Sequence, residues 1–388
     1  MDFRLFEAIF TNDKPTFMTL VQDNQDILEQ KTAKSLNTAL HLATRFGQVE
    51  FVREIVKLRP DMVAAINEDL ETPLHEACKQ GNAEVLNLLL EANPLAACML
   101  NYKGRSALFK ACSNGHLHLV KLLLNTPRLL DLEDNGVDQT SLHVAAARGH
   151  TDIVREILNV RPNFASKIDK NGFSPLHYSS SRDHLEITKM LLNLNQELAV
   201  QYDNNGYTPV HLAAMNGKTE ILKEFLSIAP TSFQFLTKEG ETVFHLFVRF
   251  NQYDAFICLV QVFEDTKLIN CPDQYGNTIL HLAAYGKHQQ LADYIINETT
   301  VNTNHRNNRG HTVYANRGQA GTTLEIGHLG DILKKVGGKR RLLSGGKGIE
   351  VDKVLEKPVK SKKVKEAKPT ATVYKEHLSF KSLQWSNI

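Results

Sequence analysis

The sequence has few of the features that mark a secreted, disulfide-rich or membrane-spanning protein. It contains one Trp and five Cys in 388 residues, and an odd number of cysteines does not indicate a disulfide framework. The best apolar stretch, 255–263, is interrupted by Gln261 and falls short of the roughly 18 consecutive apolar residues that a membrane span requires. Charges at Asp2, Arg4 and Glu7 interrupt the region where a signal peptide would be apolar. We therefore expect a chain that does not cross a bilayer and that stays on the cytosolic side.

The sequence also lacks the patterns that carry catalytic or cofactor chemistry. It has no Gly-x-Ser-x-Gly and no His-Glu-x-x-His. The glycine-rich stretch 337–348 does not match a phosphate-binding loop, because Arg341 and Gly348 stand where that loop needs Gly and Ser or Thr. We interpret it as a flexible basic linker, and we expect no enzymatic activity, no cofactor, no metal and no small-molecule substrate.

Acidic and basic residues are nearly balanced over the chain but not along it. The formal net charge is +2, yet residues 334–388 hold 15 Lys and Arg against 5 Asp and Glu, a net charge of +10. Residues 1–333 hold the other 30 Lys and Arg and 38 Asp and Glu, a net charge of −8. The body of the chain is therefore acidic and its end is basic.

One short pattern recurs along most of the chain. The heptads at 71–77 (ETPLHEA), 139–145 (QTSLHVA) and 207–213 (YTPVHLA) are examples of it. The pattern resembles the ankyrin repeat, whose signature is Thr-Pro-Leu-His-x-Ala at a period near 33, and the resemblance covers residues 1 to about 335. The Thr or Ser of the pattern recurs every 34 residues, with one interval of 36, at positions 38, 72, 106, 140, 174, 208, 242 and 278.

Each copy of the pattern has the signals of two short helices. The Thr or Ser can cap the first helix, and Pro73, Pro175 and Pro209 fit its first turn, where a missing N–H costs nothing. Glycines about two turns later supply the positive φ that ends a helix, and Asp183 and Asn251 take that place in two copies. An apolar stripe then marks the second helix, and turn residues form hairpin-like links between copies. One unit cannot bury its own stripe, so the sequence predicts an all-α ankyrin-repeat solenoid of stacked helix-turn-helix units.

The repeats also define the predicted domains. Residues 1–335 form the array, with a divergent N-terminal copy at 1–34, motif-bearing copies at 35–307 and a degenerate last copy at 308–335. This gives about nine or ten copies. Residues 336–388 form a basic tail, which we expect to be disordered because it has little apolar periodicity.

Histidines and cysteines recur at fixed phases of the repeat. Successive copies of one His should lie about 8–10 Å apart, whereas zinc ligands lie near 2 Å from one centre, so we do not expect a metal site. The resemblance implies instead that this His bonds to backbone across the repeat junction. Cys78 and Cys112 stand where other copies have small residues, so we expect both in the core. The repeated histidines are His41, His75, His143, His177, His211, His245 and His281.

The resemblance implies that partners bind at positions that the framework leaves free: the link tips, the residue before the Thr, and the end of the first helix. In two early copies these positions are mainly polar, for example Glu71, Lys79 and Arg105. Later copies place aromatic side chains, Met and Arg there, which is the composition of interface hot spots, although some of them could simply pack on neighbours. The predicted partner-binding residues, expected on one exposed face, are Phe173, Tyr178, Arg182, Tyr207 and Met215.

Three interpretations of the basic segment 334–388 remain open. It is a solvated linker, or its charge attracts it to an anionic membrane surface, or it serves nuclear import or nucleic-acid contact. In each case the partner of the repeats themselves is another protein of unknown identity.

The 34-residue period and the Pro after several second helices, as at Arg59-Pro60 and Asn93-Pro94, resemble the plant ankyrin-repeat membrane proteins. Those proteins carry a C-terminal transmembrane domain marked by Pro-Gly-Gly and are linked to defence and salt-stress signalling. This sequence has neither Pro-Gly-Gly nor an apolar span, so the resemblance concerns the repeat half only. The leading hypothesis is a protein-interaction scaffold or adaptor in plant signalling, cytoplasmic or at the cytosolic face of the plasma membrane. The alternative is a nuclear regulator that binds a transcription or chromatin partner through its repeats.

Overall fold

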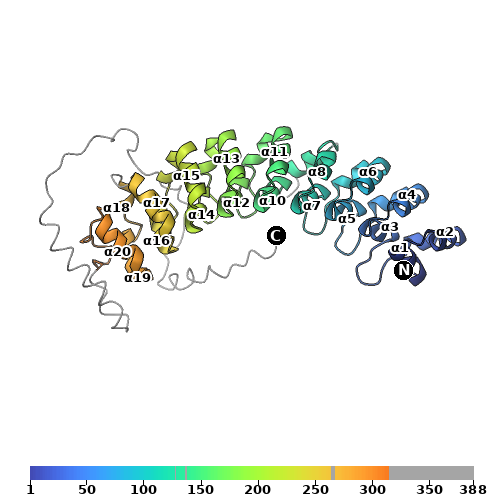
Figure 1. Ribbon diagram of the computed structural model, residues 1–388, viewed down its shortest axis with the longest axis horizontal. Coiled ribbons are helices and arrows are strands. Elements are labelled where there is room, and N and C mark those ends of the chain that lie inside the picture. Colours follow the sequence, from blue (N-terminus) through green and yellow to red (C-terminus); the bar gives the residue numbers. More distant parts are fainter. Residues whose placement is uncertain (127, 136–137, 264–266, 314–388) are drawn as a thin grey trace. The chain divides into compact units, whose positions relative to one another are not determined.

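The computed structural model is built from short helices joined by tight links, and its described residues contain no β-sheet (Figure 1). The chain divides into two compact units, Met1–Leu191 and Leu192–Ile388, and each is considered by itself below. The predicted tail, 336–388, and most of the predicted last copy, 308–335, lie outside the described residues. The structure describes residues 1–126, 128–135, 138–263 and 267–313.

The first helix of each repeat begins at the predicted cap. The Thr38 side chain accepts the N–H of His41, as an N-cap does. The helix ends follow the prediction too, because Gly81, Asp183 and Asn251 adopt φ of 82°, 69° and 55°. The first helices are α1 (Phe3–Thr11), α3 (Ala39–Arg45), α5 (Pro73–Gln80), α7 (Ala107–Asn114), α10 (Ser141–Arg148) and α12 (Pro175–Ser181), and in the second unit α14 (Pro209–Met215), α16 (Val243–Arg249) and α19 (Ile279–Gly286).

The second helix of each repeat carries one buried apolar stripe. In α4 this stripe is Phe51, Val52 and Ile55, which lie one, three or four residues apart and so share a helix face. The second helices are α2 (Lys14–Asp23), α4 (Val49–Leu58), α6 (Ala83–Ala92), α8 (Leu117–Leu124), α11 (Thr151–Val160) and α13 (Leu185–Leu194), followed by α15 (Thr219–Ile228), α17 (Tyr253–Phe263) and α20 (Gln289–Glu298).

A short helical turn follows most second helices. Pro60, Pro94, Pro162 and Pro230 each begin such a turn, where a residue without an N–H loses no hydrogen bond. Two repeats have a short α-helix at this point, α9 (Leu129–Asn135) and α18 (Lys267–Asn270). The turns are η1 (Gln25–Glu29), η2 (Pro60–Ala64), η3 (Pro94–Cys98), η4 (Pro162–Ser166), η5 (Gln196–Val200) and η6 (Pro230–Gln234).

Most of the described links between repeats are hairpins closed by an Asp or Asn side chain, and Thr32 and Thr237 take that place in two of them. Oδ1 of Asp169 accepts the N–H groups of Asn171 and Phe173 at 2.8 and 2.9 Å, which fixes the turn. Adjacent links are bonded to each other, as where the N–H of Tyr102 donates to the carbonyl of Asp69 at 3.0 Å. The link tips and the exposed side of the first helices form one surface in each unit, which we call the link face.

Stacking of the repeats buries the apolar stripes. In the first unit, the first helices α1, α3, α5, α7, α10 and α12 contact one another in order, and in the second unit α14, α16 and α19 do so. Cys78 and Cys112 are fully buried, as predicted. The prediction of an all-α solenoid of stacked helix pairs is confirmed.

Candidate interaction surface

The repeated histidine joins each repeat to the next. Nδ1 of His75 accepts the N–H of Thr72 at 3.1 Å, which leaves Nε2 to donate to the carbonyl of Arg105 at 3.1 Å. In the second unit, Nε2 of His211 donates to the carbonyl of Phe235 at 3.0 Å. Burial lowers the pKa of His211 to about 4, so its ring is neutral at physiological pH. The expected bond from this His to backbone across the junction is confirmed: Nε2 makes it, while Nδ1 bonds within its own repeat.

One junction is held by a buried glutamate instead. Phe109 stands at the histidine position of its copy, and α9 brings in Glu133, which is only 2% exposed. Glu133 accepts the hydroxyls of Ser106 and Ser141 at 2.5 Å each, and the N–H of Ser141 at 2.8 Å. Burial raises the pKa of the Glu133 carboxyl, while these three bonds act against that rise. The only sign of this in the sequence is the missing histidine.

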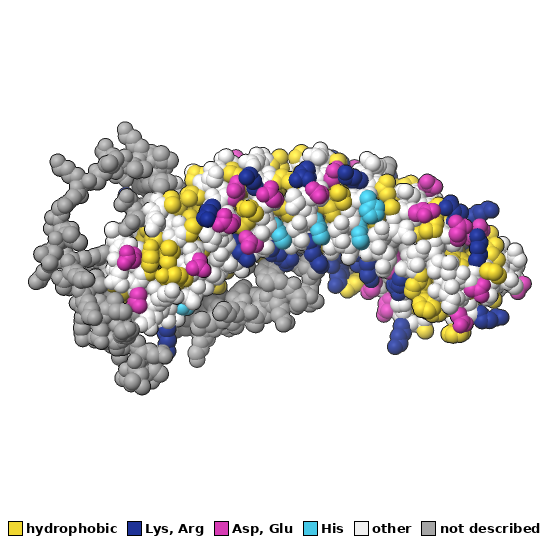
Figure 2. Space-filling view, in the orientation of Figure 1, with side chains coloured by type: hydrophobic (Ala, Val, Ile, Leu, Met, Phe, Trp, Pro, Cys, Tyr) yellow, Lys and Arg dark blue, Asp and Glu magenta, His cyan; other side chains and the backbone are white. Residues whose placement is uncertain are grey.

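A second row of side chains ties the end of one first helix to the following repeat. Nε2 of His184 donates to the carbonyl of Ala147 at 3.2 Å, and its ring fills the space beside Gly149, where an added Cβ would lie 2.7 Å from Cε1. In the second unit Gln252 replaces the histidine, and its Nε2 donates to the carbonyl of Met215 at 2.8 Å. This row was not predicted from the sequence, although His directly follows the helix-ending residue in three consecutive copies. Its histidines are His116, His150 and His184, and Figure 2 shows histidines aligned along the first unit.

Phe173 and Tyr178 lie in the interior, so the prediction that they are exposed is wrong. Phe173 is 9% and Tyr178 3% exposed, and their ring centroids are 5.4 Å apart. The Tyr178 hydroxyl donates to Oδ2 of Asp169 at 2.6 Å and accepts from Nε2 of Gln139 at 3.1 Å. Asp169, which closes the link, thus also holds the Tyr178 ring against the Phe173 ring. Both side chains are covered as a result. Burial, and then Asp169, raise the pKa of Tyr178.

Arg182 lies beside the Tyr178 ring but remains half-buried. Its Nη1 donates to the carbonyl of Ala147 at 3.0 Å, and its Cζ lies 5.9 Å from the centre of the Tyr178 ring. Burial lowers the pKa of Arg182, and nearby Arg148 lowers it further. The structure therefore brings Phe173, Tyr178 and Arg182 together in the first unit.

Tyr207 and Met215 belong to the second unit, where both are half-buried. The Tyr207 ring meets the His211 ring edge-on at a centroid distance of 6.5 Å. Burial raises the pKa of Tyr207 to about 12, so its hydroxyl stays protonated at physiological pH. Both side chains keep part of their surface available to another molecule.

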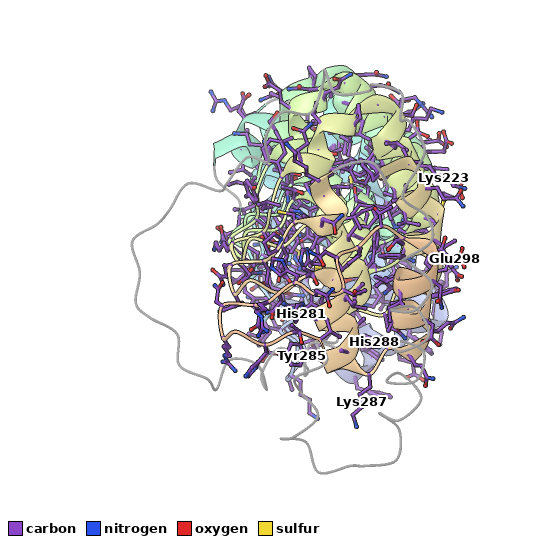
Figure 3. All side chains as sticks on the ribbon, turned by 90° about the vertical axis from the view of Figure 1, so that its left-hand side faces the viewer. Lys223, His281, Tyr285, Lys287, His288 and Glu298 are labelled. Carbon is purple, nitrogen blue, oxygen red and sulfur yellow. The ribbon has the colours of Figure 1, made fainter. Side chains whose placement is uncertain are left out.

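The link face of the second unit also includes α19, and its Tyr285 is 48% exposed. Its hydroxyl accepts from Nδ2 of Asn307 at 3.4 Å. In Figure 3, Lys287 points away from the ribbon beyond the end of α19, while Glu298 lies on the side of the second helices. This unit therefore exposes an aromatic side chain, Tyr285, in addition to the predicted Tyr207 and Met215.

The second unit contains a buried glutamate that is paired with an arginine. Glu241 is fully buried just before its cap, and its Oε1 lies 2.5 Å from Nη2 of Arg249. Burial raises the pKa of Glu241 to about 7, although Arg249 lowers it. Glu241 thus titrates close to neutral pH in the folded chain.

Among the described helices, none combines the length and the apolar character needed to cross a membrane. The described residues also contain no group of three His, Cys, Asp or Glu side chains placed to hold a metal ion.

Comparison with protein families identifies the class. The family model described as ankyrin repeats (3 copies) matches residues 5–98, 94–167, 142–232 and 210–307. The chain therefore belongs to the ankyrin-repeat family, and ankyrin repeats imply a role in protein–protein interaction.

Comparison with individual proteins adds a similar solved structure. The crystal structure of the ankyrin repeat domain of Bcl-3, described as a unique member of the IkappaB protein family, is 24% identical in sequence. The match covers 55% of this chain and 95% of that one, with a TM-score of 0.48. No curated protein matches the chain.

Proposed function

We propose that this chain is a non-catalytic scaffold or adaptor that binds a protein partner on its link face. The observation that carries the proposal is the variety of side chains at one repeated position, the residue before the cap. Arg105, Gln139 and Tyr207 stand there with part of their side chains exposed, on the same hydrogen-bonded framework that buries Phe173 and Glu241 at this position. A framework that holds each repeat while this position varies is suited to the recognition of a specific partner.

The five predicted residues take different roles in this proposal. Arg182, Tyr207 and Met215 are half-buried and present side-chain surface to the partner. Phe173 and Tyr178 are buried and act by holding Arg182 and the link in place. Aromatic, Met and Arg side chains are enriched at interfaces, which supports their assignment.

Capture of partners by the purified full-length chain tests this proposal. Proteins crosslinked to the chain are identified by mass spectrometry, and the binding of each candidate is then measured with purified components. Tyr207→Ala with Met215→Ala should weaken binding at least roughly tenfold if they contribute to the interface. Leu194→Ala with Val262→Ala is the matched control, because these exposed apolar residues lie on second helices. Equal loss in both variants would argue against the link face.

We further propose that the setting is plant defence or stress signalling on the cytosolic side. The 34-residue period supports this, as do the prolines that begin η2, η3, η4 and η6. The basic segment 334–388 would add attraction to an anionic membrane surface. Imaging a tagged chain with and without this segment tests the setting: diffuse or membrane-edge signal supports it, and tail-dependent nuclear signal supports a nuclear regulator with a nucleic-acid-binding or import tail.

A further inference from the structure

The first three links of the first unit carry large apolar side chains at their tips. Leu36 and Leu70 are each 42% exposed, and Tyr102 is 57% exposed. In Figure 1 these links extend below the helices before the chain enters α3, α5 and α7. The tip at 170–172, by contrast, holds Lys, Asn and Gly. We call Leu36, Leu70 and Tyr102 the apolar tips.

Two of the apolar tips adopt a backbone conformation that leucine seldom adopts. The φ angle is 54° at Leu36 and 56° at Leu70. In this left-handed region the Cβ of an L-residue lies too close to the following carbonyl oxygen, and glycine avoids that cost. Gly104 and Gly172 hold the same position in two other links, with φ of 68° and 79°. Leucine therefore stands where the backbone favours glycine, which indicates that its side chain has a role outside the fold.

Packing within the unit does not account for the two leucines. More than a third of each is exposed, although a leucine that supports the fold would be covered. At Gly104, the corresponding position of the third link, an added Cβ would meet no other atom within 4 Å. Several large apolar side chains on such an open surface mark a site where another molecule binds.

Backbone hydrogen bonds hold the apolar tips in a row. The N–H of Glu68 donates to the carbonyl of Ser35 at 3.0 Å, and the N–H of Tyr102 donates to the carbonyl of Asp69 at 3.0 Å. Each link contributes two extended segments, and such segments lie about 4.8 Å apart, so neighbouring tips are about 10 Å apart. Because these backbone groups are used between the links, the row offers its side chains to a partner.

Exposed charges flank the apolar tips in a fixed order. Lys34 stands beside the first tip and Lys103 beside the third, where its Nζ lies 5.4 Å from the centre of the Tyr102 ring. Glu68 and Asp69 stand beside the second tip. All four side chains are exposed, and none of them forms an ion pair within the part of the chain that the structure describes. The row is therefore basic at both ends and acidic in the middle.

We propose that the apolar tips bind an amphipathic helix of a protein partner, an inference that rests on the proposed function. A helix rises about 1.5 Å per residue, so apolar residues at every seventh position recur about 10.5 Å apart along one stripe. This distance matches the spacing of the tips. A helix also satisfies its own backbone groups, which suits a surface that offers side chains. The charges of the row call for acidic residues beside the first and third of these apolar positions and basic residues beside the second.

The same surface is less suited to a membrane. Apolar and aromatic side chains flanked by lysines are typical of segments that enter the interface of an anionic bilayer. Glu68 and Asp69, however, stand in the middle of the row, where an anionic surface would repel them and hydrocarbon would remove their water. A helix with basic residues at this point pairs with both carboxylates instead.

Three labelled peptides test the proposal on the full-length chain. The matched peptide is a helix of three heptads with one stripe of Leu, flanked by Glu in the outer heptads and by Lys in the middle one. The exchanged peptide has Lys and Glu interchanged, and the polar peptide has Ser in place of Leu. Fluorescence anisotropy measures Kd for each. We expect the matched peptide to bind at least roughly tenfold more tightly than the other two.

A glycine variant separates binding from folding. L36G/L70G should weaken binding of the matched peptide at least roughly tenfold. Its urea unfolding midpoint should not fall appreciably, because glycine relieves the strained φ and this offsets its greater freedom in the unfolded chain. The control L95A/V160A removes exposed apolar surface from η3 and α11 and should bind like the original chain.

A charge-reversal variant tests the order of charges. K34E/E68K/D69K/K103E reverses all four exposed charges and leaves the net charge nearly unchanged. This variant should bind the exchanged peptide more tightly than the matched one. An unchanged preference would show that the charges beside the tips do not recognise the helix.

Further results would overturn the proposal. They are no binding of the matched peptide, equal binding of the polar peptide, or equal loss in L36G/L70G and its control. A large fall in the unfolding midpoint of L36G/L70G would show that the leucines support the fold. Tighter, leucine-dependent binding to vesicles of phosphatidylcholine and phosphatidylserine would assign the tips to a membrane. A chain that ignores the peptides but still captures a partner through Tyr207 and Met215 would end this inference and leave the proposed function standing.

Discussion

The two units share one framework but differ in how an acid that closes a link is satisfied. In the first unit Oδ1 of Asp169 holds the link and Oδ2 accepts the hydroxyl of Tyr178. In the second unit Asp203 holds its link in the same way, but Leu212 stands at the position of Tyr178. Oδ2 of Asp203 is buried without a hydrogen-bond partner among the described residues, and burial raises the pKa of this carboxyl. The Tyr178 hydroxyl therefore satisfies Asp169, whereas no such group reaches Asp203.

The same difference explains why equivalent residues are not equally buried. Phe173 and Tyr207 each stand before a cap, yet Phe173 is 9% exposed while Tyr207 is half-buried. The anchored Tyr178 ring covers Phe173. The position of a residue in the repeat therefore determines its backbone conformation. Neighbouring side chains determine how much of its own side chain is covered.

The largest effect is expected from removing these two rings in turn. Phe173→Ala should lower the free energy of unfolding by about 3 kcal/mol, because it opens a cavity under Tyr178. Tyr207→Ala should cost about 1 kcal/mol, because part of its ring already faces solvent. Urea unfolding followed by circular dichroism measures both. Equal losses would show that the two positions are buried alike and would break the comparison.

The next effect concerns the buried ion pair of the second unit. The pKa of Glu241 is raised from 4.5 to about 7, so between these values the folded state binds more protons than the unfolded state. Stability should therefore fall as pH rises through this window, by up to roughly 3 kcal/mol. Glu241→Gln should remove this part of the pH dependence. Glu298→Gln, an exposed position on α20, is the control and should leave the dependence unchanged.

A smaller effect should follow from exchanging the aromatic hydroxyl between units. Tyr178→Phe leaves Oδ2 of Asp169 without its bond and should cost about 1–2 kcal/mol. Leu212→Tyr offers a hydroxyl to Asp203 and should be neutral or stabilising by up to about 1 kcal/mol. Urea unfolding of the two variants tests the pair. If Tyr178→Phe has no effect, water satisfies Asp169 equally well and the two links are equivalent.

Much of the fold could be predicted because its signals are local in sequence. Thr38 as a cap and Asp183 as a helix end follow from backbone requirements within one repeat. The burial of Phe173 could not be predicted, because it depends on Asp169 and Tyr178 meeting in three dimensions. Glu133 was missed for the same reason, since nothing near it in sequence shows that α9 carries it between Ser106 and Ser141.

The candidate site was predicted less well than the fold. Hot-spot composition pointed to aromatic, Met and Arg side chains, but it could not show which of them are covered. Phe173 is covered because the Tyr178 ring, which a bond to Asp169 holds, lies against it, and this contact appears only in three dimensions.

The smallest expected effect is a difference in how stability depends on pH between the histidine row of the first unit and Gln252 in the second. Burial lowers the pKa of His150, and the positive charges of Arg148, His184 and His116 lower it further. Below pH 6.5 the unfolded state therefore binds protons that the folded state resists, so stability should fall as pH falls through this range.

His150→Gln keeps a side chain able to reach the carbonyl of the preceding helix, as Gln252 does, but it removes the titrating group. Because the His150 ring is partly exposed and its neighbours are screened by solvent, we expect the acid-dependent loss to shrink by under about 0.5 kcal/mol. The difference in unfolding midpoint between pH 5 and pH 7.5 measures it, with Gln252→His as the converse variant that should introduce acid sensitivity into the second unit. If neither variant changes the pH dependence, the row is held by packing against the helix-ending glycines alone, and its charge state is irrelevant to the fold.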